Sequence, residues 1–406
     1  MDDISRYAVG LDVGTENVRA VVASVNKNNE INIIGFNEVK NSGMRKGVVA
    51  NLTGPSDAIN DVLGEVERMC GFDIKSATIS VNGAQILTTR AQGMIAVGAV
   101  EHEINTNDLN RVQEVAVSGR IPANREILNI LPFEYVLDEQ GGIKDPIGMT
   151  GARLELRANV VSALAPNCAN LRKVAEGAKV VAEGLVPSVI AAAKAVLNER
   201  QFENGVAVVD LGATTTSVAI YEEGDLQYVG VVPVGSNNIT NDLAIMLEID
   251  TDVAEEIKRR YVTADFVGGK DVVVKNGREE LKFEKSKIDE VVMARLEEIF
   301  EKIRKELKKA NYDKRLPEGI VLVGGGARMK NIEVFAKKMM ETSVKIGIPK
   351  GLGGVANMIE KPEYASVVGL ALYSACGDNV ENKRGKTKKM KDSGGVLKKI
   401  FGKFSV

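Results

Sequence analysis

The chain has 406 residues, of which 44% are hydrophobic and 27% charged, which is the composition of a folded protein with two or more domains. Three cysteines without the spacing of zinc ligands, together with a single histidine, argue against a disulfide framework and exclude a histidine-based metal site. The formal net charge of −2 conceals an asymmetry, because residues 383–406 carry nine Lys or Arg against one Asp and leave a body of charge −10.

Two further classes of protein are excluded by the distribution of apolar residues. The sequence contains no run of about 18 apolar residues, and its first residues, MDDISRY, have neither the basic nor the apolar segment of an export signal. We therefore expect a cytoplasmic chain that does not cross a membrane and whose cysteines are free thiols.

The first predicted element is a β-hairpin over residues 7–25, YAVGLDVGTENVRAVVASV, in which two strand-like runs flank a short turn. The same pattern recurs two hundred residues later in GVAVVDLGATTTSVAIYEEGDL, where an apolar strand again ends in Asp before a Gly and Thr turn. Two hairpins of one pattern predict a duplicated, two-lobed architecture.

Between the hairpins, apolar spacing predicts a helix over 55–69, a strand at 77–81 and a helix over 106–118 capped by Asn107 or Asp108. A strand is expected at 132–135. Residues 171–197 are predicted as two buried helices that are interrupted near residues 184–187.

Beyond the second hairpin, the pattern predicts helices at 239–247 and 251–260, a charged hairpin near Gly268 and Gly277, and a long charged helix over 286–310. A short strand, GIVLVGGG, then leads into a helix from about Met329 to Met340, and YASVVGLALYSA forms a final helix. Residues 378–393 have the composition of a solvated linker.

Both hairpin turns are candidate phosphate loops, because their backbone N–H groups and hydroxyls lie in a tight Gly and Thr turn that suits phosphate oxygens. The strands before them end in Asp12 and Asp210, whose carboxylates can hold a hydrated Mg²⁺ through its water shell. For either turn alone, a plain hairpin without a ligand is the alternative.

A third glycine-rich segment, Gly324 to Gly326, stands between a buried-looking strand and a helix, where a nucleoside can approach the backbone. Upstream, Glu255 and Lys258 are three residues apart on a predicted helix and share a face. They can hydrogen-bond a ribose and an adenine edge, with an ordinary surface ion pair as the alternative. The order of two phosphate hairpins, a ribose helix and an adenosine loop is more specific than its parts and predicts an ATP site.

This order resembles the actin, Hsp70 and sugar-kinase superfamily, and its details resemble one branch, the FtsA family of bacterial cell division, from about residue 6 to residue 376. The stretches that carry the resemblance are GMRKGVV at 43–49, ISVNG at 79–83, ILPFEYVLDEQGGIKDPIGMTGARLE at 130–155, AEEIK at 254–258 and RLEE at 295–298. The resemblance implies an α/β, actin-like two-lobed fold with an inserted α+β subdomain, called 1C.

The resemblance also implies how the chain divides into the subdomains of the family. Subdomain 1A takes residues 1–83 and 163–204 and a return helix at 359–377, subdomain 1C takes 84–162, subdomain 2A takes 205–250 and 317–358, and subdomain 2B takes 251–316. A basic linker at 378–393 and an amphipathic helix at 394–406 follow.

The resemblance also assigns the nucleotide site. The matched residues are Asp12, Gly14, Thr15, Glu16 and Asn17 for the first phosphate loop, Asp210, Gly212, Ala213, Thr214, Thr215 and Thr216 for the second, Glu255 and Lys258 for the ribose and base, and Gly324, Gly325, Gly326 and Met329 for the adenosine loop. Ala213 and Thr214 replace glycine-richer residues of the family, and Glu16 and Asn17 replace a small or basic pair. Because backbone N–H groups hold the phosphates, we expect binding to persist with altered affinity.

No catalytic residue is expected. Chaperone relatives place a Glu before a Pro where this chain has Val186 before Pro187, and a positioned acid or base typically contributes about 10²- to 10⁴-fold. We therefore predict binding of ATP and Mg²⁺ with slow or undetectable hydrolysis.

The last residues form a predicted amphipathic helix. At about 100° per residue, its apolar side chains fall within one arc of roughly 140° and its lysines outside that arc. The apolar residues are Val396, Leu397, Ile400, Phe401 and Phe404, and the lysines are Lys398, Lys399 and Lys403. This pattern predicts reversible binding to an anionic membrane surface, with docking in a protein groove as the alternative.

The resemblance implies the remaining partners. They are the C-terminal peptide of FtsZ on subdomain 2B, other copies of the chain in filaments, and further division proteins through subdomain 1C, all at the cytoplasmic face of the membrane at the division site. Arg295 is the candidate contact for the acidic peptide, with pairing to Glu298 or another helix acid as the alternative. Nucleic acid is not expected. A PilM-like adaptor of a pilus or secretion machine is the alternative function.

Overall fold

The structure is a computed structural model that describes residues 4–98, 101–266, 268–276 and 279–376. The predicted linker at 378–393, the predicted membrane helix at 394–406 and Gly277 of the predicted hairpin lie outside the described residues. Within the described residues, none of the helices is both long enough and apolar enough to span a membrane.

Lobe one is built on a six-stranded sheet with the strand order β11-β6-β1-β2-β3-β19. Strands β1, β2 and β3 form an antiparallel meander, and β6 and β11 extend it in parallel. The strands are β1 (Ile4–Val13), β2 (Asn17–Asn26), β3 (Ile31–Lys40), β6 (Ser76–Val81), β11 (Val181–Pro187) and β19 (Gly353–Gly354), with β4 (Met44–Arg45) and β5 (Val48–Val49) as a separate small pair.

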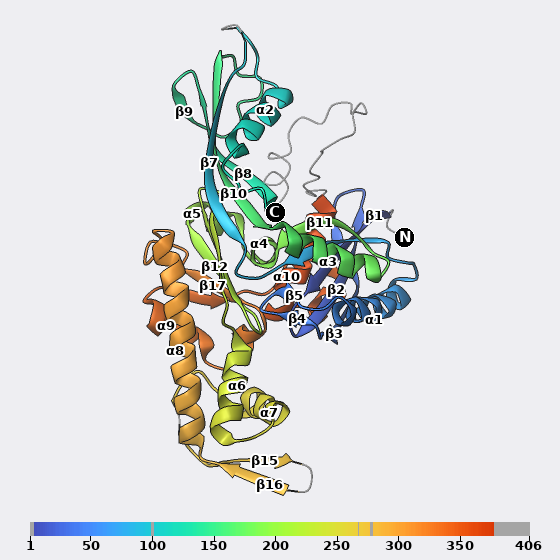
Figure 1. The fold of residues 1–406 in the computed structure, drawn as a ribbon, viewed down its shortest axis with the longest axis vertical. Coiled ribbons are helices and arrows are strands. Elements are labelled where there is room, and N and C mark those ends of the chain that lie inside the picture. The colour runs from blue at the N-terminus through green and yellow to red at the C-terminus, as the bar shows by residue number, and fades with distance from the viewer. Residues whose placement is uncertain (1–3, 99–100, 267, 277–278, 377–406) are drawn as a thin grey trace.

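Helices cover both faces of the lobe-one sheet (Figure 1). Helices α1 (Thr53–Cys70) and α3 (Ala165–Gly177) bury apolar side chains against one face, and α10 (Ala365–Cys376) packs on the other. Helix α4 (Ser188–Val196) crosses α10 and also borders lobe two. The short helix α5 (Glu199–Asn204) then leads into lobe two.

Lobe two repeats the plan of lobe one. Its sheet has the order β14-β13-β12-β17-β18, in which β12, β13 and β14 form an antiparallel meander and β17 and β18 are added in parallel. The strands are β12 (Val206–Leu211), β13 (Thr216–Glu222), β14 (Asp225–Val232), β17 (Ile320–Val323) and β18 (Val344–Ile346). The duplicated, two-lobed architecture predicted from the two hairpins is therefore confirmed.

The distal part of lobe two lies at one end of the long axis of the molecule (Figure 1). It contains α6 (Ser236–Leu247), α7 (Thr251–Tyr261) and the pair β15 (Val272–Asn276) and β16 (Glu279–Phe283). The long helix α8 (Lys285–Lys309) runs from this end up to α9 (Ile332–Met340) beside the sheet. Helix α6 packs on both α7 and α8 and so joins the distal part to the sheet of lobe two.

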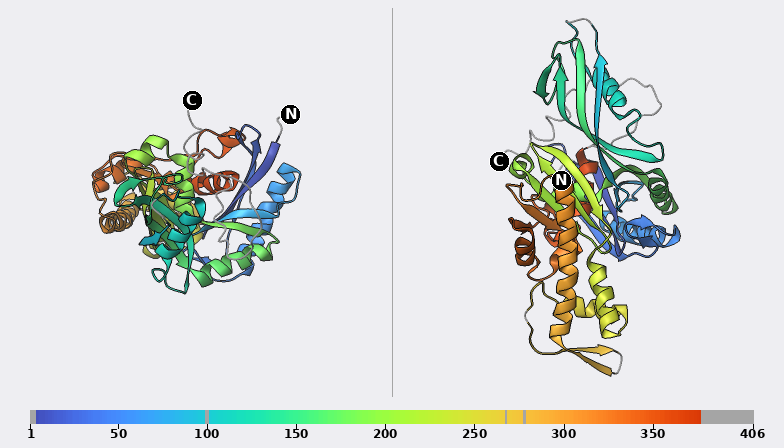
Figure 2. Two further views of the ribbon diagram at one scale, coloured as in Figure 1. Left: turned by 90° about the horizontal axis from the view of Figure 1, so that it is seen from above. Right: turned by 60° about the vertical axis from the view of Figure 1, so that its left-hand side comes forward.

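The inserted subdomain, residues 84–162, lies at the opposite end of the long axis (Figure 2). It is a sheet of order β7-β10-β8-β9 with one helix packed against it. Its elements are β7 (Leu87–Ala96), α2 (Thr106–Val117), β8 (Arg125–Leu137), β9 (Gln140–Ile143) and β10 (Arg153–Leu164).

The inserted subdomain interrupts the sequence of lobe one between β6 and α3, yet it contacts the edge strand β14 of lobe two. The Thr88 hydroxyl accepts from the Val229 amide at 2.8 Å and lies 3.2 Å from the Val229 carbonyl oxygen. The buried Asn159 amide donates to the Leu226 carbonyl at 2.8 Å. An exposed sheet edge invites unwanted pairing, so these contacts protect β14 and attach the subdomain to the second lobe.

Three element predictions were wrong in detail. The cap of α2 is Asn105, whose side chain accepts from the Asn107 amide, while Asp108 is the returning member of a capping box. The interruption predicted at 184–187 is strand β11, because its apolar side chains complete the lobe-one sheet. The helix predicted from Met329 starts only at Ile332, since Asn331 has a positive φ of 62°.

Short 3₁₀ turns complete the described chain. They are η1 (Gly325–Arg328), η2 (Ala356–Met358) and η3 (Pro362–Tyr364). The first lies directly after β17 and the last directly before α10, so both border the region where the two lobes meet.

Candidate functional site

The two hairpin turns have the same main-chain geometry. The Gly14 amide donates to the Asn17 carbonyl at 3.1 Å, and the Gly212 amide donates to the Thr215 carbonyl at 3.0 Å. A Cβ atom on Gly14 or Gly212 would lie 2.7 or 2.8 Å from the same carbonyl oxygens, closer than carbon normally approaches oxygen. Both turns therefore need glycine, and each keeps its backbone accessible.

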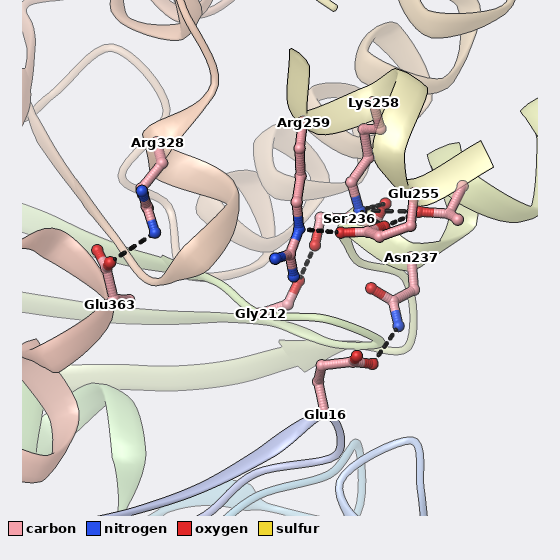
Figure 3. Close-up of polar contacts among 10 residues, drawn as sticks. Glu16, Gly212, Ser236, Asn237, Glu255, Lys258, Arg259, Arg328 and Glu363 are labelled. Atoms are coloured by element: carbon pink, nitrogen blue, oxygen red, sulfur yellow. Dashed lines mark hydrogen bonds and ion pairs between the residues drawn. The ribbon is translucent and has the colours of Figure 1, made fainter. Parts of the chain in front are cut away.

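The turns face one another across the boundary between the lobes. The hydroxyls of Thr15 and Thr214 lie 3.0 Å apart, and the Asn237 amide donates to the Glu16 carboxylate at 3.0 Å (Figure 3). The structure thus brings together two segments that are 199 residues apart in the sequence. Thr216 differs from its neighbours because its buried hydroxyl donates to the Val234 carbonyl at 2.8 Å inside lobe two.

Asp12 is buried and Asp210 is partly buried, and each is the second-last residue of its strand, beside one of the two turns. Burial raises the pKa of Asp12, against a hydrogen bond from Ser80 and the nearby charge of Arg19. Burial and the neighbouring carboxyl of Asp12 raise the pKa of Asp210 to about 6. Two desolvated carboxylates that repel each other favour a cation between or beside them.

The two carboxylates fit a hydrated magnesium ion. Among the described residues, the Oδ1 oxygen of Asp12 is buried without a hydrogen-bond partner, which is costly unless another group supplies a donor. The described residues contain no group of three or more His, Cys, Asp or Glu side chains arranged around a metal. Mg²⁺ commonly uses one or two carboxylates together with waters and substrate phosphates, and Asp12 and Asp210 can supply the carboxylates of such a set.

Asp210 also contacts two serines that the sequence reasoning did not single out. The hydroxyls of Ser188 and Ser366 both lie 3.3 Å from its Oδ2 oxygen. Each serine opens an otherwise apolar helical segment, VPSVIAAAKAV or YASVVGLALYSA. A buried polar side chain in such a segment needs a hydrogen-bond partner. A serine at the start of an apolar helix therefore indicates a buried polar contact, although the sequence does not identify the partner.

The glycines of 324–326 bring η1 against the end of β12. Gly324 has a φ of 86°, and a Cβ there would lie 2.3 Å from an Asp210 carboxylate oxygen. A Cβ on Gly326 would lie 2.9 Å from the Leu211 Cβ, whereas Gly325 has open space around it. Met329 packs on the core of lobe two. The third glycine segment therefore lies beside the second turn, as the ATP-site pattern requires.

Glu255 and Lys258 form a partly buried cluster with Thr240 and Ser236 (Figure 3). The Lys258 ammonium lies 2.6 Å from the Glu255 carboxylate and donates to the Thr240 hydroxyl at 2.8 Å. Burial lowers the pKa of Lys258, whereas for Glu255 the hydrogen bonds from Lys258 and Thr240 outweigh burial and lower its pKa.

This cluster is connected to the second turn. Ser236, at the start of α6, donates through its amide and its hydroxyl to the Gly212 carbonyl at 2.9 and 3.2 Å. The Lys258 ammonium in turn lies 3.4 Å from the Ser236 carbonyl oxygen. The ion-pair alternative is therefore observed, but at the edge of the candidate site rather than on a free surface.

A further ion pair joins the glycine segment to the start of the return helix. The Arg328 guanidinium contacts Oε1 of Glu363 at 2.9 Å, and both residues are visible in Figure 3. Glu363 is buried, and among the described residues its Oε2 oxygen has no hydrogen-bond partner. Arg328 and Glu363 were not predicted as site residues.

Arg295 lies away from the turns, on α8. Its guanidinium forms a two-pronged pair with Asp242 of α6, at 2.5 and 2.9 Å, and also contacts Glu298. Pairing with a helix acid, the alternative weighed for this residue, is thus present in the structure. Three of the five N–H donors of the guanidinium are engaged by these two partners.

Two family models match the chain. One is described as "Cell division protein FtsA" and matches residues 207–369, and the other is described as "SHS2 domain inserted in FTSA" and matches residues 83–162. The second match coincides with the inserted subdomain.

Curated cell division proteins named FtsA are similar to this chain along most of its length. The protein of Pseudomonas aeruginosa is 32% identical and covers 91% of this chain and 89% of its own length. That of Borreliella burgdorferi is 32% identical with 98% and 97% covered, and that of Escherichia coli strain K12 is 30% identical with 91% and 90% covered.

Solved structures confirm the actin-like fold class. A PilM–PilN type IV pilus biogenesis complex superposes with a TM-score of 0.68 at 16% identity, covering 91% of this chain and 98% of that chain. MreB5 of Spiroplasma citri bound to AMPPNP gives 0.54 at 16% identity, covering 93% and 99%. Identities this low show the fold alone, so the likeness to PilM does not outweigh the sequence matches.

Proposed function

Because the chain belongs to the FtsA family of cell division proteins, we propose that it binds ATP, polymerises and tethers the FtsZ division ring to the cytoplasmic membrane. The observation that supports ATP binding is the pair of equivalent turns, in contact through Thr15 and Thr214, beside the buried Asp12 and the partly buried Asp210. The actin-like MreB5 bound to AMPPNP is consistent with such a site.

The residues of the site have separate roles in this proposal. The backbone N–H groups of the two turns bind phosphate oxygens, and Asp12 and Asp210 hold Mg²⁺ through its water shell. Bound there, Mg²⁺ would neutralise phosphate charge. Gly324 to Gly326 and Met329 lie against the adenosine, and Glu255 and Lys258 bind the ribose and base after giving up part of their mutual pairing.

Hydrolysis is slow in this proposal. Val186 and Pro187 close β11 where chaperone relatives carry a glutamate, and the next side chain, Ser188, is hydrogen-bonded to Asp210 and Asn82. A neutral hydroxyl in this place is a weak general base. Whether nucleotide is bound, rather than how fast it is hydrolysed, then determines whether the protein assembles into filaments.

The membrane is reached through the amphipathic segment at 394–406 and the basic linker before it. Each Lys or Arg near an anionic surface contributes about 1 kcal/mol, but ordering the tail costs roughly 1 kcal/mol or more for each residue, so a single tail binds weakly and reversibly. Polymerisation would join many tails on one surface and strengthen the attachment without new contacts. In this proposal the protein acts at the cytoplasmic face of the membrane, at the division site.

The distal part of lobe two is the proposed site for the C-terminal peptide of FtsZ, with Arg295 as a contact. Its guanidinium is only partly buried and links α6 to α8, so a peptide carboxylate can compete with Asp242 or Glu298. The inserted subdomain, which projects at the other end of the molecule (Figure 2), is the proposed site for further division proteins.

Vesicle co-sedimentation tests this function. The full chain and a version ending at Asp392 are mixed with anionic vesicles, with and without ATP, and the vesicles are then examined by electron microscopy. We expect ATP to increase pelleting of the full chain at high protein density and to produce filaments on the vesicles. The shortened chain should bind ATP equally well and remain in solution.

Two outcomes would contradict the proposal. If the shortened chain pellets with the vesicles as much as the full chain does, the tail is not the membrane-binding segment. Equal binding of the ATP-loaded chain and of a free peptide of residues 394–406 would remove the contribution of assembly.

A further inference from the structure

Helices α4 and α10 both begin beside Asp210. Ser188 is the first residue of α4 and Ser366 the second residue of α10. Both serines are almost completely buried, with exposed fractions of 3% and 5%, and both hydroxyls lie 3.3 Å from Oδ2 of Asp210. One carboxylate of lobe two therefore has a hydroxyl from each of two lobe-one helices within hydrogen-bond distance.

The same two helices touch each other one turn further on. Ala191 and Gly369 each follow the serine of their helix by three residues, and a Cβ on Gly369 would lie only 1.8 Å from the Ala191 carbonyl oxygen. At this crossing the two backbones are in direct contact. Because packed helices move as rigid units, a shift of either serine is passed to the crossing within a single helical turn.

The Ser188 hydroxyl lies within hydrogen-bond distance of two acceptors. Besides Asp210 it donates to the Asn82 side chain, which follows β6 of lobe one. A serine has one hydroxyl proton, so it can serve only one of the two acceptors at a time. One acceptor belongs to each lobe, and a stronger demand of Asp210 for the proton would draw it away from Asn82, which is the nearer acceptor at 2.5 Å against 3.3 Å.

The other side of the Asp210 carboxylate is bordered by bare backbone. Oδ1 of Asp12 is buried without a partner among the described residues, and a Cβ at Gly324 would clash with the Asp210 carboxylate. Asp210 is thus held by hydroxyls on one side and closely approached by bare backbone on the other. This arrangement restricts the orientation of its carboxylate before any ion arrives.

We propose that Ser188 and Ser366 are positioning residues: they orient the Asp210 carboxylate for the water shell of Mg²⁺–nucleotide and link that ion to the crossing of α4 and α10. This inference deepens the proposed function and rests on it. Neither serine contacts the nucleotide in this proposal. Their effect is therefore confined to the part of the binding affinity that depends on Mg²⁺.

The test compares ATP affinity with Mg²⁺ and with EDTA in Ser366→Ala, Ser188→Ala and Ser366→Thr. A hydrogen bond to a charged group is worth roughly tenfold in an equilibrium constant, so each alanine should reduce the enhancement by Mg²⁺ about five- to tenfold and leave the affinity in EDTA unchanged. Threonine retains the hydroxyl and should restore the enhancement. The matched control is Ser24→Ala, which alters a buried serine on β2 whose hydroxyl lies 3.4 Å from the Asn32 carbonyl oxygen.

Hydrogen exchange supplies a second readout. In the unaltered chain, Mg²⁺–ATP should slow amide exchange in α4 and α10 relative to ATP in EDTA. Ser366→Ala should lose most of this difference, whereas Ser24→Ala should keep it.

The outcomes separate the positioning role from the proposed function. An unchanged enhancement by Mg²⁺ in both alanine variants, with ATP still bound, would overturn the positioning role alone. An equal loss of affinity with Mg²⁺ and with EDTA would show a general structural role and would also overturn it. If the unaltered chain binds no ATP under either condition, the proposed function fails and the positioning role fails with it.

Discussion

The side-chain hydroxyls of Thr15 and Thr214 lie 3.0 Å apart although 199 residues separate them in the chain. Each belongs to a turn with the same Gly-centred hydrogen bond, and each turn follows a strand whose second-last residue is Asp. This contact is the point at which the two copies of one structural pattern meet.

Thr15→Val and Thr214→Val should each weaken ATP binding about three- to tenfold, because each removes one hydroxyl from the turn. The double variant should lose less than the two single losses combined, since the residues are in contact and their effects are coupled. A double-mutant cycle on ATP dissociation constants measures this. Thr216→Val is the control: its hydroxyl bonds to Val234 inside lobe two, so it should lower stability and leave ATP affinity unchanged.

Asp210→Asn should stabilise the ligand-free protein above pH 6. Burial and Asp12 raise the pKa of Asp210 to about 6 from an ordinary value of 3.8. Between these two pH values the folded state holds a proton that the unfolded state has lost, so stability falls as pH rises and stays lower above pH 6. Melting temperatures from pH 4 to 8 should therefore fall less steeply in the variant between pH 4 and 6.

The same substitution should cost function. A neutral amide attracts a hydrated cation less than a carboxylate does, so Asp210→Asn should lose most of the Mg²⁺-dependent affinity for ATP. Higher stability with weaker ATP binding is the expected trade-off where a binding site holds a destabilising charge. A variant that is less stable than the unaltered chain at pH 7 would contradict the account of Asp210 as a destabilising buried charge.

Gly369→Ala should destabilise the protein by about 1–3 kcal/mol, because the new Cβ would lie 1.8 Å from the Ala191 carbonyl oxygen and force α4 and α10 apart. Gly64→Ala on α1 is the matched control. A Cβ at Gly64 would have no atom within 4 Å, so alanine should stabilise the helix by about 0.5–1 kcal/mol. Denaturant midpoints of the two variants should move in opposite directions.

Thr88→Val should loosen the inserted subdomain from lobe two. The substitution leaves the Val229 amide without the acceptor it now has at 2.8 Å, at a cost of about 1–3 kcal/mol for an unpaired buried group. Hydrogen exchange at β14 should quicken. Thr89→Val, one residue along and on the other side of β7, should leave exchange at β14 unchanged, and equal effects of the two variants would refute the attachment.

Asp242→Asn tests the proposed role of Arg295. Loss of the Asp242 charge frees the guanidinium that it now binds at 2.5 and 2.9 Å, so affinity for an acidic FtsZ C-terminal peptide should rise about two- to fivefold. Arg295→Glu should abolish that binding. If both variants fold and neither changes peptide affinity, Arg295 serves only to tie α6 to α8.

The local patterns of the sequence were sufficient for most of the elements and for the symmetry of the fold. Hairpins around Gly14 and Gly212, the long helix α8 and the final helix α10 follow from runs whose apolar spacing matches one type of structure. The error at β11 arose because a buried parallel strand and a buried helix have similar apolar runs, and only pairing with β6 separates them.

The candidate site, too, could be predicted only in part from the sequence. Its glycines, its two aspartates and the pair Glu255 and Lys258 could be predicted, because each belongs to a short motif with its own chemistry. Ser188, Ser366, Arg328 and Glu363 could not, since their partners are far away in sequence or on the other lobe.

By itself, the sequence determined that the chain has two equivalent lobes, that it carries turns suited to phosphate, and that an acidic body precedes a basic end. These properties depend on neighbouring residues and on composition. Only the tertiary structure decided that Thr15 meets Thr214, that Asp210 lies at the start of both α4 and α10, and that Arg295 pairs with Asp242. Such contacts depend on how helices and sheets pack, and packing is a property of the whole chain rather than of any segment.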